Sequence, residues 1–184
     1  MQQQRRNRPA RRASDSVCAP PGFDPITGVA TRALFRARVE QEWQRAAQSK
    51  RLVAVIMFSI DRFRECGGAA AAICQQAVAE VIATHCRRRA DFVGRMRDHE
   101  FAILLSGATR QGARQLAEAI RKAIEAQQLK PAAGDWALTV SCGVAGMVPR
   151  PTRFVDALLI AADAGLREAR RMGGNTVRAS SALR

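Results

Sequence analysis

The spacing of apolar residues along the chain predicts alternating helices and strands. Phe35, Val39 and Trp43 recur every four residues, which indicates an amphipathic helix. Residues 52–60 then form an unbroken apolar run rich in Val and Ile, as in a strand that is buried on both faces. A long alanine-rich helix begins near Ala69. The first third of the domain therefore predicts a helix, a strand and a second helix.

The remaining segments continue this alternation. Two short apolar runs, 92–96 and 101–106, flank a polar turn and predict a hairpin. The later segments are a helix from about Gln111, a strand over 136–145, a helix over 154–171 and a short strand near 175–179. This order predicts an α/β fold with a central mixed sheet of about five strands flanked by helices.

Composition divides the chain into three parts. A length of 184 residues with 47% hydrophobic residues can support a single core, which we expect over residues 21–178. The formal net charge is +14, and five arginines precede the first acidic residue, Asp15. Because residues 1–20 have few apolar side chains to bury, they are predicted to form a disordered basic arm. Residues 179–184 are predicted to be a flexible tail.

The arm leaves several functions open. A cluster of arginines can bind nucleic acid, anionic lipid or an acidic protein, because counterion release favours any polyanion. It can equally be a solvated tail without a dedicated partner.

The sequence contains no apolar run near eighteen residues and no hydrophobic segment after the first charges. These features predict a cytoplasmic protein without a membrane span or secretory signal. Its five irregularly spaced cysteines indicate reduced thiols. A zinc site from Cys66, Cys74, His85 and Cys86 is disfavoured, because these spacings match no common zinc pattern.

Four motifs then point to a family. They are "DPITGVATR" (24–32), "FSIDRFR" (58–64), "VSCGVA" (140–145) and "AADAGLREARRMGGN" (161–175). In this order and with these gaps, the chain from Phe23 to Val177 resembles the GGDEF, or diguanylate cyclase, domains of bacteria. The first motif departs from the family pattern at Thr31, where the family has Asn. The resemblance implies a nucleotide-cyclase-like fold and a link to the dinucleotide cyclic di-GMP.

The segment "RDHEF" (97–101) falls where the family carries its Gly-Gly-Asp/Glu-Glu-Phe signature. Arg97 and Asp98 replace the two glycines, which in the family let the backbone approach GTP. His99 and Ser59 stand where the resemblance implies two carboxylates that bind magnesium. Asp61 is the second acid of the same strand end, and it is present.

Further family positions also differ. Gly67 and Gln76 stand at the two guanine-recognition positions, and Arg170 and Gly174 at a phosphate-binding Lys and a nearby Arg. Because imidazole and hydroxyl groups are poor magnesium ligands, the resemblance predicts a degenerate domain that is not an enzyme and binds no magnesium.

One family site is present. "RRAD" ends five residues before the signature, so Arg88 and Asp91 match the family's RxxD site for cyclic di-GMP. An Arg guanidinium can donate two hydrogen bonds to guanine O6 and N7, and a carboxylate can accept hydrogen bonds from the N–H groups of the base. The same pair can also be an ordinary surface ion pair that persists as a relic. Both interpretations stay open.

Further arginines near this site affect which ligand charge it prefers. Arg87, Arg89 and Arg95 lie near the pair and favour a dianionic ligand. The family's additional arginine maps to Ala119, about one helical turn from Arg114 and Arg121, which are candidates to replace it.

These features predict a catalytically inactive GGDEF domain that serves as a cyclic di-GMP receptor or regulatory module. We expect protein partners and dimerisation on ligand binding. The alternatives are a ligand-free scaffold and a domain whose basic arm binds nucleic acid or an acidic partner.

Overall fold

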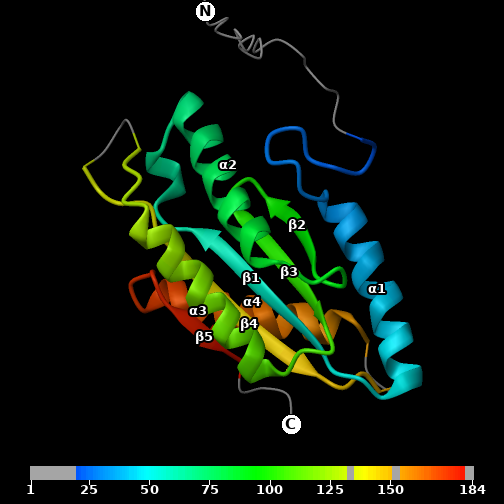
Figure 1. Ribbon diagram of the computed structural model, residues 1–184. Helices are drawn as coiled ribbons and strands as arrows, with labels where there is room; N and C mark the ends of the chain where they lie inside the picture. The colour runs from blue at the N-terminus through cyan, green and yellow to red at the C-terminus, as the bar shows by residue number, and fades with distance from the viewer. Residues whose placement is uncertain (1–19, 132–134, 151–153, 181–184) are drawn as a thin grey trace, which may run out of the picture.

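The computed structural model describes residues 20–131, 135–150 and 154–180. Its strands are β1 (Val53–Ile60), β2 (Phe92–Arg97), β3 (Glu100–Ser106), β4 (Val140–Met147) and β5 (Val177–Ala179). Its helices are α1 (Arg32–Ser49), α2 (Gly68–His85), α3 (Arg110–Ala126) and α4 (Asp156–Arg171), with a short 3-10 helix, η1 (Phe63–Glu65), after β1. Figure 1 shows the sheet at the centre of the molecule, with β1 between β3 and β4.

The five strands form one mixed sheet in the order β2-β3-β1-β4-β5. β1 pairs antiparallel with both β3 and β4, β2 and β3 form a hairpin, and β5 runs parallel to β4. The predicted α/β fold with a mixed five-stranded sheet is confirmed.

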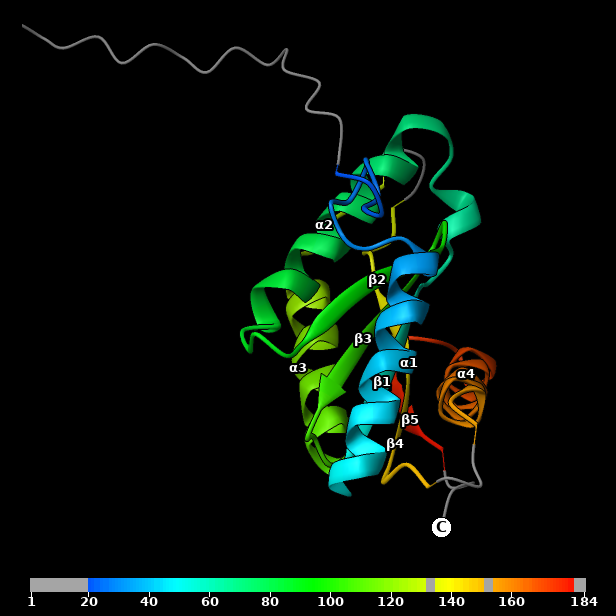
Figure 2. The same ribbon diagram turned by 90° about the vertical axis from the view of Figure 1, so that its right-hand side faces the viewer.

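The helices cover the sheet in two layers. Figure 2 shows α2 and α3 on one side of the strands and α4 on the other. Successive side chains of a strand point to opposite faces. In β1, Ile56 and Phe58 therefore pack in the core under α2 and α3, while Val53 and Val55 pack with α1 and α4. This explains the unbroken apolar run, since both faces of β1 are buried.

Two glycines allow the α1 and α4 layer to approach the sheet. A Cβ atom on Gly94 of β2 would lie 2.6 Å from the Cβ atom of Phe35 on α1. A Cβ atom on Gly143 of β4 would lie 2.1 Å from the carbonyl oxygen of Ala162 on α4. Both contacts are closer than side chains allow, so these strand glycines set the helix positions.

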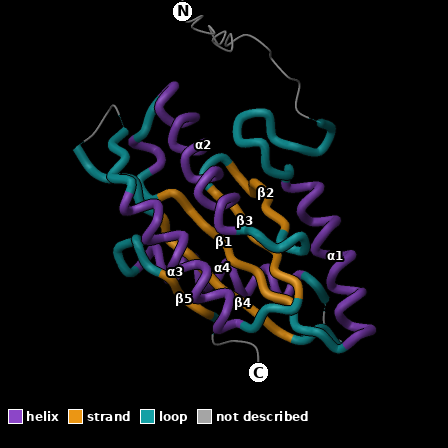
Figure 3. The backbone as a smooth tube through the Cα atoms, in the orientation of Figure 1, coloured by secondary structure: helices purple, strands orange, loops and turns teal. Residues whose placement is uncertain are grey.

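The segment before α1 lies beside the edge strand β2, as Figure 3 shows. The Ala30 N–H donates to the Val93 carbonyl (3.2 Å), and the Arg95 N–H donates to the Ala30 carbonyl (2.8 Å). This contact covers backbone groups of an edge that would otherwise be unpaired.

Most of the predicted basic arm, residues 1–19, lies outside the described residues, as do residues 181–184 of the predicted tail. Ala179 belongs to β5, and the Ser180 N–H donates to the Val144 carbonyl (2.9 Å). Within the described ranges, every helix is too short or too polar to cross a lipid bilayer.

Candidate functional site

The turn between β2 and β3 holds the segment that replaces the family signature. None of the residues from Arg97 to Glu100 has a positive φ, so their bulky side chains occupy the turn without backbone strain. The β2–β3 register shifts between Arg95 and Arg97, as at a β-bulge. The turn therefore forms without the glycines that the family uses.

The two metal positions lie at the end of the sheet near this turn. Ser59 is buried directly opposite Glu100, and its hydroxyl donates to the neighbouring Ile60 carbonyl (3.5 Å). The His99 ring stacks on Phe63, with ring centroids 5.6 Å apart. Both side chains thus have protein contacts of their own.

Glu100 is the buried acidic side chain at this turn, and two arginines and a histidine lie close to it. Arg97 Nε, His99 Nε2 and Arg170 NH1 lie 3.5, 3.6 and 3.8 Å from its carboxylate. Burial lowers the pKa of His99, Glu100 opposes that shift, and Arg170 and Arg97 reinforce it. Burial, reinforced by the two arginines, therefore favours an uncharged imidazole at position 99.

Asp61 connects the end of β1 to β4 and to the segment between α4 and β5. Its carboxylate accepts hydrogen bonds from the Thr139 hydroxyl (2.8 Å), the Ser141 hydroxyl (2.6 Å) and the Asn175 N–H (2.9 Å). A Cβ atom on Gly174 would lie 3.1 Å from this carboxylate. The acid that matches the family motif is therefore held by protein donors.

These residues do not fit a magnesium ion. Magnesium prefers carboxylate and other oxygen ligands in octahedral geometry. Ser59 and His99 supply no carboxylate, and Asp61 is engaged by three protein donors. Over residues 20–131, 135–150 and 154–180, no three His, Cys, Asp or Glu side chains gather closely enough to hold a metal ion.

The residues weighed for zinc are distributed along α2. Cys66 and Cys74 lie near its beginning, whereas His85 and Cys86 lie at its end. His85 Nδ1 hydrogen-bonds to the Val81 carbonyl (2.8 Å), which is the structural role expected of a half-buried helix histidine.

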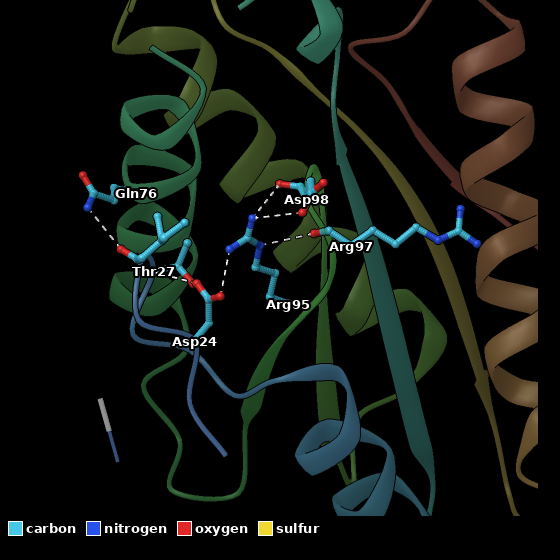
Figure 4. Close-up of polar contacts among 7 residues, drawn as sticks. Asp24, Thr27, Gln76, Arg95, Arg97 and Asp98 are labelled. Atoms are coloured by element: carbon cyan, nitrogen blue, oxygen red, sulfur yellow. Dashed lines mark hydrogen bonds and ion pairs between the residues drawn. The ribbon is translucent and has the colours of Figure 1, made fainter. Parts of the chain in front are cut away.

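The two guanine positions lie on α2. Gly67 is the N-cap of this helix and has φ 61°, a conformation that suits glycine. Gln76 Nε2 donates to the Ile26 carbonyl (3.1 Å), so this side chain ties α2 to the loop before α1 (Figure 4).

Arg95, predicted as an accessory ligand residue, points toward this same loop. Its NH1 lies 2.8 Å from the Asp24 carboxylate, and both side chains are largely buried. Thr27 donates to Asp24 through its N–H and its hydroxyl. Although burial opposes the shift, these bonds and Arg95 hold the pKa of Asp24 below its ordinary value. Arg95 also reaches Asp98 in the turn (3.4 Å), so it connects the loop to the hairpin (Figure 4).

Arg88 and Asp91 lie in a tight turn immediately after α2. The Asp91 N–H donates to the Arg88 carbonyl (2.9 Å), and the Arg88 N–H donates to Asp91 Oδ2 (3.3 Å). Both residues line a cavity of about 490 Å³ between the end of α2 and the beginning of α3. The structure thus brings the RxxD pair together beside an empty volume.

The second oxygen of Asp91, Oδ1, has no hydrogen-bond partner among the described residues. Oδ1 is buried, and no side chain or backbone donor in the described part of the chain contacts it. Burial raises the pKa of Asp91, with a partial offset from the Arg88 N–H and guanidinium. Burial also raises the pKa of Cys86 to about 12, and the nearby Asp91 charge adds to this. An unpaired buried acceptor is costly, so a hydrogen bond to this oxygen would stabilise the protein.

Of the candidate accessory residues, Arg87 lines the cavity and the others lie elsewhere. Arg121 contacts Glu118 (2.7 Å), Glu125 (2.9 Å) and Asn175 (2.7 Å), away from the lining residues. Arg114 lies on the outer surface of α3 with Gln111, Glu118 and Lys122.

Sequence reasoning missed the α3 side of the cavity. Thr109 and Gln115 belong to its lining. The sequence did contain one signal for this side of the cavity, because Thr109 is a residue type that often caps the start of a helix. Its hydroxyl accepts a hydrogen bond from the Gly112 N–H (3.0 Å) at the start of α3.

Two curated proteins are similar to this chain. Diguanylate cyclase DgcP of Pseudomonas aeruginosa is 29% identical over 153 residues, and diguanylate cyclase A of Treponema denticola is 28% identical over 136 residues. The alignments cover 82% and 72% of this chain, but 22% and 36% of the relatives. The chain thus spans the smaller part of each relative's length.

Three solved structures share the fold. The GGDEF domain of DgcB from Caulobacter crescentus, in complex with c-di-GMP, has a TM-score of 0.82 and 24% identity, covering 93% of this chain and 99% of that one. SiaD from Pseudomonas aeruginosa, in complex with its activator SiaC, has a TM-score of 0.78 and 22% identity, covering 88% and 62%. The FimX GGDEF domain from Pseudomonas aeruginosa gives 0.76 and 20%, covering 84% and 97%.

The prediction that the chain is not an enzyme is corrected by these similarities. Both curated relatives are named as diguanylate cyclases, so these similarities support membership of that family and do not support a loss of activity. That prediction rested on replaced side chains such as Ser59 and His99. The identity of these side chains changes which groups could bind a metal, but it does not establish that the protein has lost activity.

The family itself follows from a match over most of the chain. The family model described as "Diguanylate cyclase, GGDEF domain" matches residues 22–176, from the loop before α1 to the residue before β5. This agrees with the region over which the four motifs were found. The chain therefore belongs to the GGDEF domain family of diguanylate cyclases.

Proposed function

We propose that this domain is a receptor for cyclic di-GMP, which binds in the cavity beside Arg88 and Asp91. The observation that carries the proposal is Asp91 Oδ1, a buried acceptor with no hydrogen-bond partner in the described residues. A guanine base presents its N1–H and 2-amino donors side by side and matches a carboxylate at this position. Ligand binding would satisfy the acceptor that the protein leaves unpaired.

The cations at the cavity support the same ligand. Arg88 is exposed at the cavity and can fork onto guanine O6 and N7. Arg87 also lines the cavity, with Nε donating to the Thr84 carbonyl (3.3 Å), and its charge favours the ligand phosphates. The fold is shared with the DgcB domain, whose structure is in complex with c-di-GMP.

This binding uses side chains of the protein and is expected to need no magnesium. Affinity should therefore be the same with EDTA as with added magnesium. A receptor of this kind passes its bound state to another protein, and the SiaD structure with its activator shows a related fold that has a protein partner.

The test is isothermal titration of cyclic di-GMP into the purified protein and two variants, Asp91→Ala and Arg88→Ala. Charge-assisted hydrogen bonds contribute about 1.5–3 kcal/mol, so each variant should bind roughly tenfold to a hundredfold more weakly. Arg89→Ala is the matched control, because Arg89 is exposed in the same turn but does not line the cavity. Absence of binding by the unmodified protein, or equal binding by Asp91→Ala, would contradict the proposal.

A further inference from the structure

His85, the last residue of α2, lines the same cavity of about 490 Å³ as Arg88 and Asp91. Its side chain is half-buried, and the contacts assigned above to cyclic di-GMP do not use it. The protein provides a partner for one of its two ring nitrogens, as described below. The other nitrogen is therefore a group of the cavity whose role is unassigned.

The hydrogen bond of His85 Nδ1 fixes the tautomer of the ring. Nδ1 lies 2.8 Å from the Val81 carbonyl oxygen, about one helical turn earlier. A carbonyl oxygen can only accept, so Nδ1 carries the hydrogen and donates it. The Thr84 hydroxyl donates to the same carbonyl (2.8 Å), so it does not supply a hydrogen to Nδ1.

The second nitrogen, Nε2, is consequently an acceptor. In an uncharged imidazole with a hydrogen on Nδ1, Nε2 has a lone pair and no hydrogen. Nε2 of His85 has no hydrogen bond or ion pair with any residue of the described ranges. Because the bond to Val81 also holds the ring in place, this acceptor is oriented before a ligand arrives.

The neighbouring groups of the cavity limit what this acceptor can bind. Arg87 and Arg88 supply donors, which suit the phosphates and the O6 and N7 atoms of guanine. Asp91 is the carboxylate assigned to the guanine N–H groups. On the α3 side, Thr109 and Gln115 are uncharged. His85 therefore requires a donor of the ligand other than those of the base.

We propose that His85 Nε2 accepts a hydrogen bond from a ribose 2′-hydroxyl of the bound dinucleotide, so that the cavity selects ribonucleotides over deoxyribonucleotides. This inference rests on the proposed function. Cyclic di-GMP has hydrogen-bond donors on its guanine bases and its ribose hydroxyls, whereas its phosphates only accept. With the base donors bound by Asp91, the 2′-hydroxyl is the donor that remains, and it is the group that distinguishes RNA from DNA.

The test compares cyclic di-GMP with its 2′-deoxy analogue by isothermal titration at about pH 8, where imidazole side chains are ordinarily uncharged. The unmodified protein should bind the analogue about twofold to tenfold more weakly, the effect of one hydrogen bond between uncharged groups. His85→Phe has no acceptor, so the ratio of the two affinities should fall by about the same factor. Comparing the ratios cancels any effect of the analogue's altered sugar conformation, because both proteins experience it.

Two variants check the assignment to His85. His85→Gln keeps an acceptor oxygen at this position and should retain part of the discrimination. Gln115→Leu tests the rival amide of the same cavity and should discriminate as the unmodified protein does. Circular dichroism of each variant verifies that it is folded.

The outcomes separate this inference from the proposed function. If the unmodified protein binds both dinucleotides equally, the inference is overturned while the receptor function stands, and this result needs no variant. The same conclusion follows if folded His85→Phe keeps the full ratio, or if Gln115→Leu loses it instead. Failure of the unmodified protein to bind cyclic di-GMP at all would overturn the receptor function and this inference together.

Discussion

Asp61 and Asp91 are both partly buried carboxylates next to a cavity, but the protein treats them differently. Asp61 accepts three hydrogen bonds of 2.6 to 2.9 Å from Thr139, Ser141 and Asn175. Asp91 accepts one long bond at Oδ2, and its Oδ1 has no partner in the described residues. The protein supplies donors for both oxygens of the first carboxylate but for only one oxygen of the second among the described residues.

The charges around the two regions reinforce this contrast. Near the turn, Arg97 and Arg170 lie 3.5 and 3.8 Å from the Glu100 carboxylate, so this acid has cationic partners within the protein. At the cavity beside Asp91, Arg87 and Arg88 are exposed, so their charges face the solvent-filled space of the cavity. A matching residue in a family motif can therefore have a structural role, and the unpaired atom shows where a ligand is expected.

The largest expected effect comes from making the same alanine substitution at Asp61 and at Asp91. Asp61→Ala removes an acceptor from three donors, one of them on the fully buried Ser141, and should lower the free energy of unfolding by about 3 kcal/mol. Asp91→Ala removes one long bond and should change it by less than about 1 kcal/mol. Urea unfolding measures the free energy of unfolding of both variants, and their m-values should equal that of the unmodified protein. Equal losses at the two positions would break the comparison.

A smaller effect is expected where Arg95 connects the loop to the hairpin. Asp24→Ala leaves the largely buried Arg95 without its 2.8 Å partner and should cost about 2 kcal/mol. Asp98→Ala is its control, because Asp98 is 85% exposed and lies 3.4 Å from the same guanidinium, so the cost should stay below about 0.5 kcal/mol. A double-mutant cycle of Asp24→Ala with Arg95→Met isolates the pair energy. A coupling near zero would show that this ion pair does not hold the loop.

The sequence predicted the layers of the fold because apolar periodicity reports burial directly. The run 52–60 corresponds to β1, and the two runs around the turn correspond to β2 and β3. The same patterns do not report which distant residues meet. Arg95 was expected near the ligand, but its partner Asp24 is 71 positions away in the sequence.

The site shows the same limit at closer range. Arg121 was a candidate because it is about one turn from Ala119, yet it contacts Asn175 between α4 and β5, 54 positions away. Arg88 and Asp91 could be predicted together because a short turn fixes residues that are three apart. Whether Asp91 had a protein partner depended on every element around the cavity, and no local pattern contains that information.

The smallest expected effect is a pH dependence of opposite sign at two aspartates. Burial raises the pKa of Asp91 above its ordinary 3.8, so between pH 3.8 and the folded-state pKa the native state binds more protons at this group than the unfolded state does. Stability from this group therefore falls as pH rises from 3.8 through the folded-state pKa. Asp24 has a lowered pKa, so its contribution is present above 3.8 and is lost as pH falls through its lower folded-state pKa.

Urea unfolding between about pH 3 and pH 7 separates the two contributions. Asp91→Asn should gain stability relative to the unmodified protein as pH rises, and Asp24→Asn should lose it. If a guanine donates to Asp91, the bound ligand stabilises the carboxylate and lowers its pKa. Saturating cyclic di-GMP should then reduce or reverse the Asp91 slope while the Asp24 slope persists. A ligand that binds without changing the Asp91 slope would have to contact the protein elsewhere, because satisfying that buried oxygen necessarily changes its proton affinity.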